Sequence, residues 1–219
     1  MPRRAAVANG RSLAWLFGGA FLALVIALVP LGWTSLGSVR RNMRRTRTQA
    51  MSDNLTGLAN RTQFHMRLDE ALAGAQRNAT RVGLLLLDLD GFKAINDTGG
   101  HAAGDRLLRR VAAGLGEVTR RNELACRLGG DEFAVVVPRV GDREELRGLA
   151  DRLHEKLDLP VSFADGRTLR VTASIGVALY PDDARSSDDL VTVADAAMYQ
   201  VKLARKSQLP AALRSQAVR

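Results

Sequence analysis

Apolar residues recur after residue 51 with two spacings, one typical of helices and one of strands. Phe64, Leu68 and Leu72 lie four residues apart, which puts them on one helix face. The run 82–87 is apolar almost throughout and is bounded by turn signals, as in a strand covered on both faces. These patterns predict helices over 61–77, 103–118, 143–157 and 190–204, and strands over 82–87, 124–128, 133–137, 168–173 and 174–179.

The order of these elements indicates an α+β (α/β) fold. It is α-β-α-β-β-α-β-β-α, which favours a mixed, mainly antiparallel central sheet with helices on one or both faces. Gly129 and Gly130 separate two short apolar runs and predict a hairpin. No internal repeat or low-complexity tract appears after residue 51.

An uncharged apolar segment precedes this domain. Residues 12–39 contain no charged side chain, and 13–33 are apolar enough to cross a bilayer. Trp15 and Trp33 lie near the ends of that stretch, as interfacial anchors do. The alternatives are a cleaved signal peptide and a buried core helix, and the arginine-rich sequence that follows disfavours the signal peptide. We expect a single-pass transmembrane helix over 12–36.

The net charge of +9 is concentrated around the apolar segment. Residues 1–50 hold eight arginines and no acid, and subtracting eight from +9 leaves +1 for residues 51–219. The domain is nearly neutral, so its composition does not indicate a nucleic-acid partner. Three arginines lie in the flank 1–11 and five in the linker 37–52, which favours a cytoplasmic domain anchored in the inner (cytoplasmic) membrane. The basic linker is expected to contact membrane lipid.

Acidic residues follow the central apolar run. Asp88 and Asp90 share one face of an extended strand, and hard oxygen ligands at a strand end suit Mg²⁺. Asp131 and Glu132 would oppose them if the hairpin lies beside that strand. The alternative is a pair of solvated acids. Because Lys93 adds a cation for phosphate, the whole pattern favours an enzyme that acts on nucleoside triphosphates. The single cysteine, Cys126, excludes an internal disulfide and is expected in the core.

Five motifs, in order along residues 53–206, make the chain resemble the GGDEF family of diguanylate cyclases. The resemblance implies one folded domain over 53–206 and a tail over 207–219. That family is related in fold to the palm of polymerases and to nucleotidyl cyclases, with a ferredoxin-type core. The motifs are DNLTGLANR (53–61), LDLDGFKAINDTGGHAAGD (87–105), RLGGDEF (127–133), SIGVA (174–178) and DAAMYQVK (195–202).

The resemblance implies a reaction and a metal site. Each domain would bind one GTP, and two domains would meet as a homodimer in which each 3′-hydroxyl attacks the α-phosphate of the other nucleotide. The products would be cyclic di-GMP and two pyrophosphates. Asp88, the backbone carbonyl of Leu89 and Asp131 would hold Mg²⁺, or Mn²⁺, so that Asp90 is not an equal ligand. Either Glu132 or Asp131 would assist deprotonation of the attacking hydroxyl.

The resemblance also implies substrate contacts. Asn96 and Asp105 would bind the guanine edge, whose N1–H and amino groups are donors. Gly129 and Gly130 would allow close approach, while Lys93 and Lys202 would contact phosphates. Each has a plainer alternative: a turn residue for Asn96, a helix N-terminal acid for Asp105 and a solvated lysine for Lys202. For two further residues we expect structural roles, in a loop for His101 and in the core for Tyr199.

The chain departs from the family pattern in three ways. Arg120 and Glu123 form R-x-x-E where the family's inhibitory site has R-x-x-D, which puts product inhibition in doubt. Lys206 takes the place of a family arginine and keeps the charge without bidentate geometry. No sensor domain is recognisable, so regulation would come through the membrane helix, dimerisation or an unidentified sensory or effector protein.

Two other function classes remain open. One is a catalytically inactive GGDEF-type module that binds GTP or cyclic di-GMP and acts through a partner. The other is a membrane scaffold that uses the fold only to dimerise. Both hairpin acids are retained, which favours an active enzyme over either alternative.

Overall fold

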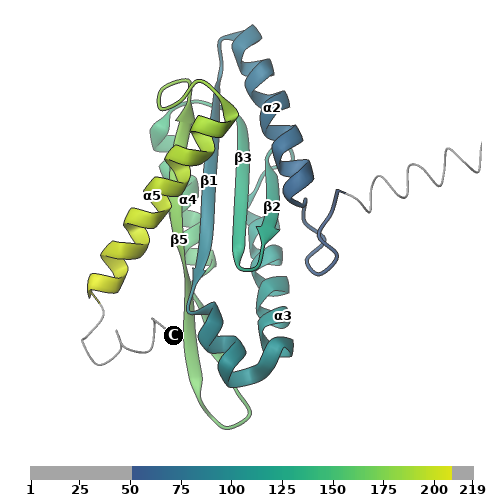
Figure 1. Ribbon diagram of the computed structural model, residues 1–219, viewed down its shortest axis with the longest axis vertical. Helices are drawn as coiled ribbons and strands as arrows, with labels where there is room; N and C mark the ends of the chain where they lie inside the picture. The colour runs from purple at the N-terminus through teal and green to yellow at the C-terminus, as the bar shows by residue number, and fades with distance from the viewer. Residues whose placement is uncertain (1–50, 209–219) are drawn as a thin grey trace, which may run out of the picture. The chain divides into compact units, whose positions relative to one another are not determined.

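The structure, a computed structural model, describes residues 51–208 (Figure 1). The predicted flank (1–11), transmembrane helix (12–36) and most of the linker (37–52) and tail (207–219) lie outside the described residues. Within 51–208, none of the helices combines the length and apolar character needed to cross a membrane.

A five-stranded sheet forms the centre of the domain. β1 (Arg81–Asp90) is its middle strand, β3 (Glu132–Val140) and β5 (Thr168–Tyr180) flank it, and β2 (Leu124–Gly129) and β4 (Leu159–Ser162) form the edges, in the order β2-β3-β1-β5-β4. Every pairing between these five strands is antiparallel, so the prediction of a mixed sheet is wrong. The two hairpins, β2–β3 and β4–β5, account for the outer pairings.

Helices cover both faces of the sheet (Figure 1). On one face, α2 (Arg61–Asn78) and α5 (Ser187–Gln208) enclose a core with Leu84 and Leu86. On the other, α3 (Phe92–Val118) and α4 (Arg143–Lys156) enclose a larger core with Leu85 and Leu87. Alternate residues of β1 therefore enter different cores, which explains why this strand is an unbroken apolar run.

The third strand region differs from its prediction. Residues 168–173 and 174–179 form one continuous strand, β5, and the missed partner is the short edge strand β4. Ser174 gave the impression of a break because it is polar, yet it is fully buried and pairs across the sheet with Asp88. β4 contains Pro160, which is tolerated at a sheet edge because an edge strand has a free hydrogen-bonding side.

Helix α3 begins earlier than predicted and bends. It starts at Phe92, and Gly100 interrupts it with φ 71° and ψ 172°. The left-handed φ suits glycine, which has no Cβ to clash. The sequence predicted only the part after the bend, because glycine at 99 and 100 weakens a helical pattern. The other predicted helices and the β2–β3 hairpin are confirmed.

Helix α5 packs directly against β5 at Gly176. A Cβ added there would lie 2.0 Å from the Ala194 carbonyl oxygen and 2.3 Å from the Met198 nitrogen. The absence of a side chain therefore lets the helix backbone approach the sheet. This close packing fixes the distance between the sheet and the last turns of α5, which lie over the end of β1.

Candidate active site

The end of β1 meets the β2–β3 turn. Asp88 pairs with Glu132 of β3 on one side and with Ser174 of β5 on the other. Beyond that pair, the Leu89 N–H donates to the carbonyl oxygen of Asp131 at 3.3 Å. The structure therefore brings the acidic end of β1 and the Gly-Gly-Asp-Glu hairpin together, as the sequence predicted if the two strands were neighbours.

The turn depends on glycine and on an arginine that sequence analysis did not single out. Gly129 and Gly130 have φ of 152° and 53°, values that side-chain-bearing residues rarely adopt. The Arg127 guanidinium donates to the Gly130 carbonyl oxygen at 2.8 Å and to Asp53 at 3.0 Å. Arg127 thus ties the hairpin to the turn that begins at Asp53.

Arg127 also influences the ionisation of its acidic partner. Burial would raise the pKa of Asp53, but hydrogen bonds from Thr56 and Arg127 outweigh it, and the pKa lies below its ordinary value. Asp53 therefore stays ionised at neutral pH and keeps Arg127 in place. The signal in the sequence was the shared presence of both residues in the motif segments 53–61 and 127–133.

Two carboxylates and one ammonium group share the site. Lys202 of α5 donates to Asp88 through Nζ at 2.6 Å. Burial, followed by the negative charge of Asp88, raises the pKa of Asp131. Partial burial would lower the pKa of Lys202, but the hydrogen bond and charge of Asp88 outweigh it and raise that pKa. The two carboxylates thus carry more negative charge than Lys202 alone neutralises.

This excess of negative charge suits a divalent cation. Asp88 and Asp131 offer hard oxygen ligands, and their mutual repulsion is what a bound cation relieves. Within residues 51–208, no group of three or more His, Cys, Asp or Glu side chains could hold a metal ion. A cation here would have the two carboxylates as side-chain ligands, and the Leu89 carbonyl is the backbone ligand that the family resemblance implies.

Asp90 is occupied by other groups. Its carboxylate accepts hydrogen bonds from Ser174 Oγ at 2.9 Å, Thr172 Oγ1 at 3.3 Å and Arg205 Nη1 at 3.1 Å. The strand periodicity alone gave Asp90 and Asp88 equal standing as ligands. Their surroundings differ because β5 supplies two hydroxyl groups opposite Asp90.

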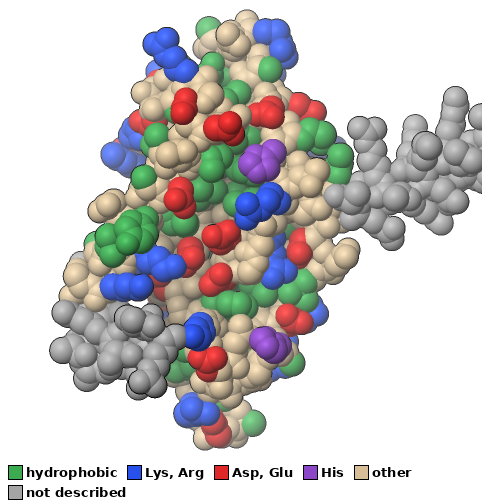
Figure 2. Space-filling view, in the orientation of Figure 1, with side chains coloured by type: hydrophobic (Ala, Val, Ile, Leu, Met, Phe, Trp, Pro, Cys, Tyr) green, Lys and Arg blue, Asp and Glu red, His purple; other side chains and the backbone are tan. Residues whose placement is uncertain are grey.

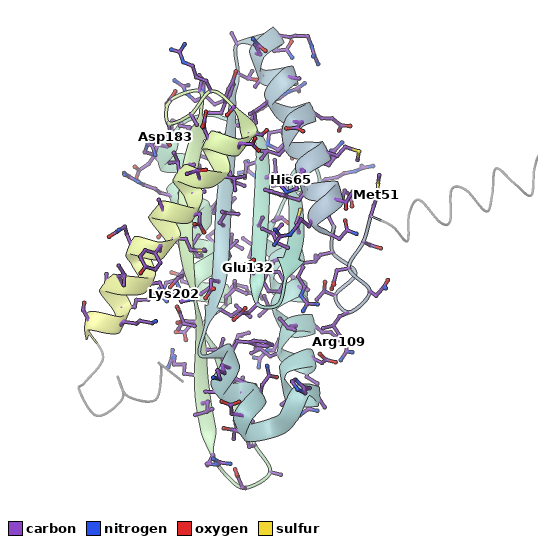
Figure 3. The ribbon with its side chains drawn as sticks, viewed as in Figure 1. Met51, His65, Arg109, Glu132, Asp183 and Lys202 are labelled. Carbon is purple, nitrogen blue, oxygen red and sulfur yellow. The ribbon has the colours of Figure 1, made fainter. Side chains whose placement is uncertain are left out.

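The two hairpin acids also lie in different surroundings. Asp131 is partly buried beside Asp88, whereas Glu132 is exposed and lies 3.5 Å from Arg61 Nη2. Arg61 donates in addition to the Leu128 carbonyl oxygen at 3.0 Å. Figure 3 shows Glu132 at the start of β3 and Lys202 on α5 at a similar level of the sheet. In Figure 2, acidic and basic side chains lie close together in the middle of this face.

The bend in α3 brings two other predicted residues near each other. A Cβ added to Gly104 would lie 2.1 Å from Asn96 Oδ1, so the Asn96 side chain rests against the backbone next to Asp105. Asp105 is partly exposed. Lys93 is exposed on the first turn of α3, two residues after Gly91, whose φ of 86° turns the chain out of β1.

The remaining predicted residues lie farther from the acids or in unexpected positions. Lys206 is exposed, while its neighbour Arg205, which sequence analysis did not assign a role, contacts Asp90. His101 belongs to helix α3 just after its bend, so its prediction as a loop residue is wrong. Tyr199 is 55% exposed, so its prediction as a core residue is also wrong. Cys126 is fully buried, as predicted.

Arg120 and Glu123 are engaged with each other and with α4. Glu123 accepts the backbone N–H of Arg120 at 2.7 Å, and its side chain is only 4% exposed. The Arg120 guanidinium lies 3.9 Å from Glu123 through Nε and donates to Glu145 at 2.9 Å through Nη1. The longer carboxylate of the R-x-x-E sequence is thus turned inward onto its own turn.

Comparisons with known proteins agree with this arrangement. The family model described as diguanylate cyclase, GGDEF domain, matches residues 50–208. Diguanylate cyclase TpbB of Pseudomonas aeruginosa is 40% identical over 154 residues, which cover 70% of this chain and 35% of TpbB. Diguanylate cyclase DgcN of Escherichia coli is 40% identical over 169 residues, which cover 77% of this chain and 41% of DgcN. The chain thus spans less than half of the length of these curated relatives.

Solved structures share the fold. A sensory box/GGDEF family protein from Caulobacter crescentus superimposes with a TM-score of 0.65 at 42% identity, covering 70% of this chain and 99% of that one. The coiled coil and GGDEF domain of DgcB from Caulobacter crescentus, in complex with c-di-GMP, gives a TM-score of 0.75 at 30% identity and covers 82% of this chain and 95% of that one. By its matched residues, its motifs and its fold, the chain belongs to the GGDEF domain family of diguanylate cyclases.

Proposed function

We propose that this protein is a diguanylate cyclase that condenses two GTP molecules into cyclic di-GMP and two pyrophosphates. The observation that carries the proposal is the arrangement at the end of β1, where Asp88, Asp131 and Lys202 converge beside a glycine turn. Paired carboxylates with an adjacent ammonium group suit a cation and a polyphosphate at one place. The named diguanylate cyclases among the relatives support the same reaction.

The metal ligands in this proposal are Asp88, Asp131 and the Leu89 carbonyl. Mg²⁺, or Mn²⁺ in its place, would supply a Lewis acid for the α-phosphate and neutralise charge on the leaving pyrophosphate. Asp131 is suited to this role because its own charge is unfavourable until a cation is near. Asp90 has no part in it, since three donors already occupy its carboxylate.

The other residues bind and orient the nucleotide. Lys202, Lys93 and Lys206 would contact phosphates, and the absence of side chains at Gly129 and Gly130 would let the backbone approach them. Asp105 would accept hydrogen bonds from the N1–H and amino groups of guanine, and Asn96 could both accept and donate at the guanine edge. The bend in α3, which rests Asn96 against Gly104, supports their joint action.

The two hairpin acids, Asp131 and Glu132, would have different roles in the reaction. Asp131 lies with Asp88 and is suited to holding the cation. Glu132 is exposed and has a long, weak contact of 3.5 Å with Arg61. We therefore assign Glu132 the deprotonation of the attacking 3′-hydroxyl, a proton transfer for which it is accessible.

The reaction requires two nucleotides, whereas the described site has one set of ligands. A homodimer with the two sites facing each other would supply the second nucleotide. We further propose that residues 12–36 anchor the protein in the inner membrane, that the basic linker contacts anionic lipid, and that the domain lies in the cytoplasm, where GTP is available. A sensory or effector protein acting through these segments would control dimerisation.

The test is synthesis by the purified 219-residue chain. With GTP and Mg²⁺, the wild type should form cyclic di-GMP, and a chelator should stop the reaction. Asp131→Ala should abolish product, whereas Asp151→Ala, an exposed acid on α4, is the matched control and should retain it. Nucleotide binding without product from an enforced dimer would overturn the proposal and favour the inactive binding module.

A further inference from the structure

Arg205 joins three separate elements near the end of α5. Its Nη1 donates to Asp90 of β1 at 3.1 Å and to Thr172 of β5 at 3.0 Å. Its Nη2 lies 2.9 Å from Nε2 of His154, on α4. A guanidinium group can make several such contacts at once because its donors form a rigid planar fork. Arg205 therefore fixes its helix to two strands and to a second helix.

The acceptor in this network is itself held in place. Ser174 Oγ donates to both oxygens of Asp90, at 2.9 and 3.0 Å, and Ser174 is fully buried. Thr172 contributes a further hydrogen bond to Asp90. The carboxylate therefore has a defined orientation before Arg205 reaches it, which reduces the entropy lost on forming the ion pair.

Arg205 lies three residues after Lys202, on the same side of α5. Side chains with this spacing are neighbours on a helix. Their partners, Asp88 and Asp90, are likewise neighbours on one face of β1. Two ion pairs thus lie side by side, at 2.6 Å for Lys202 and 3.1 Å for Arg205. Both are partly buried, so they are screened less than surface pairs.

We propose that Arg205 is a positioning residue that holds the end of α5 on the sheet and so keeps Lys202 at the active site. The inference rests on the proposed function, in which Lys202 contacts phosphate. Lys202 must exchange Asp88 for the nucleotide, and during that exchange its own ion pair no longer fastens the helix. The pair of Arg205 with Asp90 persists because it lies outside the cation site.

A direct role in phosphate binding is the competing explanation, since Lys206 occupies the position of a family arginine. The contacts disfavour it: both terminal nitrogens of Arg205 already have partners in the protein. To bind a phosphate, Arg205 would have to give up its contacts with Asp90, Thr172 and His154. The two explanations differ in whether the effect of Arg205 requires Lys202.

The first test measures amide hydrogen exchange in the full-length chain without nucleotide. Arg205→Gln should speed exchange in the last turns of α5, at residues 199–206, by about tenfold or more, as loss of a charged hydrogen-bond network allows. Arg147→Gln changes an exposed arginine on α4 and is the matched control, which should leave exchange there unchanged. Unchanged exchange in Arg205→Gln would overturn the inference, whether or not the protein makes cyclic di-GMP.

The second test is a double-mutant cycle on product formation. Arg205→Gln should lower kcat/KM by about ten- to a hundredfold, the loss expected for a catalytic group misplaced by about 1 Å. In a Lys202→Ala background the same change should cause no further loss, and Arg205→Lys should recover part of the wild-type value. Independent, multiplying losses would show that Arg205 acts without Lys202 and would refute the positioning role.

Discussion

The contact between α5 and β5 at Gly176 can be tested with one methyl group. In Gly176→Ala, the new Cβ would lie 2.0 Å from the Ala194 carbonyl oxygen, 2.3 Å from the Met198 nitrogen and 2.7 Å from the Met198 Cβ. Ordinary contacts begin at 3.4 Å. Two of the three atoms belong to the helix backbone, so no side-chain rotation relieves the clash. The helix must move away from the sheet.

The size of the effect follows from these distances. A retreat of roughly 1 Å or more is needed, and overpacking of this kind lowers the free energy of unfolding by about 1–3 kcal/mol. Lys202 follows Met198 by one helical turn, and its 2.6 Å contact with Asp88 would be lost in the same movement. Misplacement by about 1 Å can reduce the rate about a hundredfold. Gly176→Ala should therefore lose both stability and cyclic di-GMP synthesis.

The assay is denaturant unfolding followed by far-ultraviolet circular dichroism. Both tryptophans, Trp15 and Trp33, precede the domain, so tryptophan fluorescence would not report its unfolding. Gly116→Ala is the control, because an added Cβ there meets nothing within 4 Å and alanine favours an exposed helix by about 0.5–1 kcal/mol. Gly176→Ala as stable as the wild type would show that α5 does not pack this closely on β5.

Three further predictions concern single side chains. The pKa of Asp131 is higher in the folded than in the unfolded protein, so ionisation of Asp131 opposes folding. This penalty is absent below the ordinary pKa of 3.8, grows as pH rises from 3.8 to the folded pKa, and is constant above it. In the presence of a chelator, Asp131→Asn should therefore have a higher free energy of unfolding than the wild type at neutral pH. The difference should vanish when denaturant unfolding is measured below pH 3.8. Burial raises the pKa of the Cys126 thiol to about 12. A thiol reagent at mildly alkaline pH should therefore modify Cys126 rapidly only in denaturant, and fast modification of the folded protein would contradict its burial. Ala79 ends α2 with φ 50°, and Ala79→Gly should raise the free energy of unfolding by about 1 kcal/mol, measured by the same denaturant titration.

Much of the site follows from local sequence signals. The short apolar run before Asp88, bounded by turn signals, favours a strand buried on both faces, and the two glycines before Asp131 favour a turn with left-handed backbone. These signals predicted that strand, the hairpin and its acids. They act over a few residues, so no knowledge of distant segments is needed to interpret them.

Other features depend on residues far apart in the chain. Asp88 and Asp90 are equivalent in strand periodicity, and their difference arises because β5 aligns Ser174 and Thr172 with them, more than eighty residues later. The role of Arg205 depends on the same alignment. A polar residue within an apolar run, such as Ser174, looks like a strand end until its buried partner is known.

The sequence by itself determined the family motifs, the central strand, the glycine turn and the acids that would bind a cation. Only the tertiary structure decided which of Asp88 and Asp90 lies beside Asp131 and which is held by β5, where α3 bends, and that Lys202 and Arg205 reach these two carboxylates on β1. The physical reason is that periodicity and turn propensity are short-range properties. Ionic partners and pKa shifts are instead set by strand register and by the height at which a helix packs on the sheet.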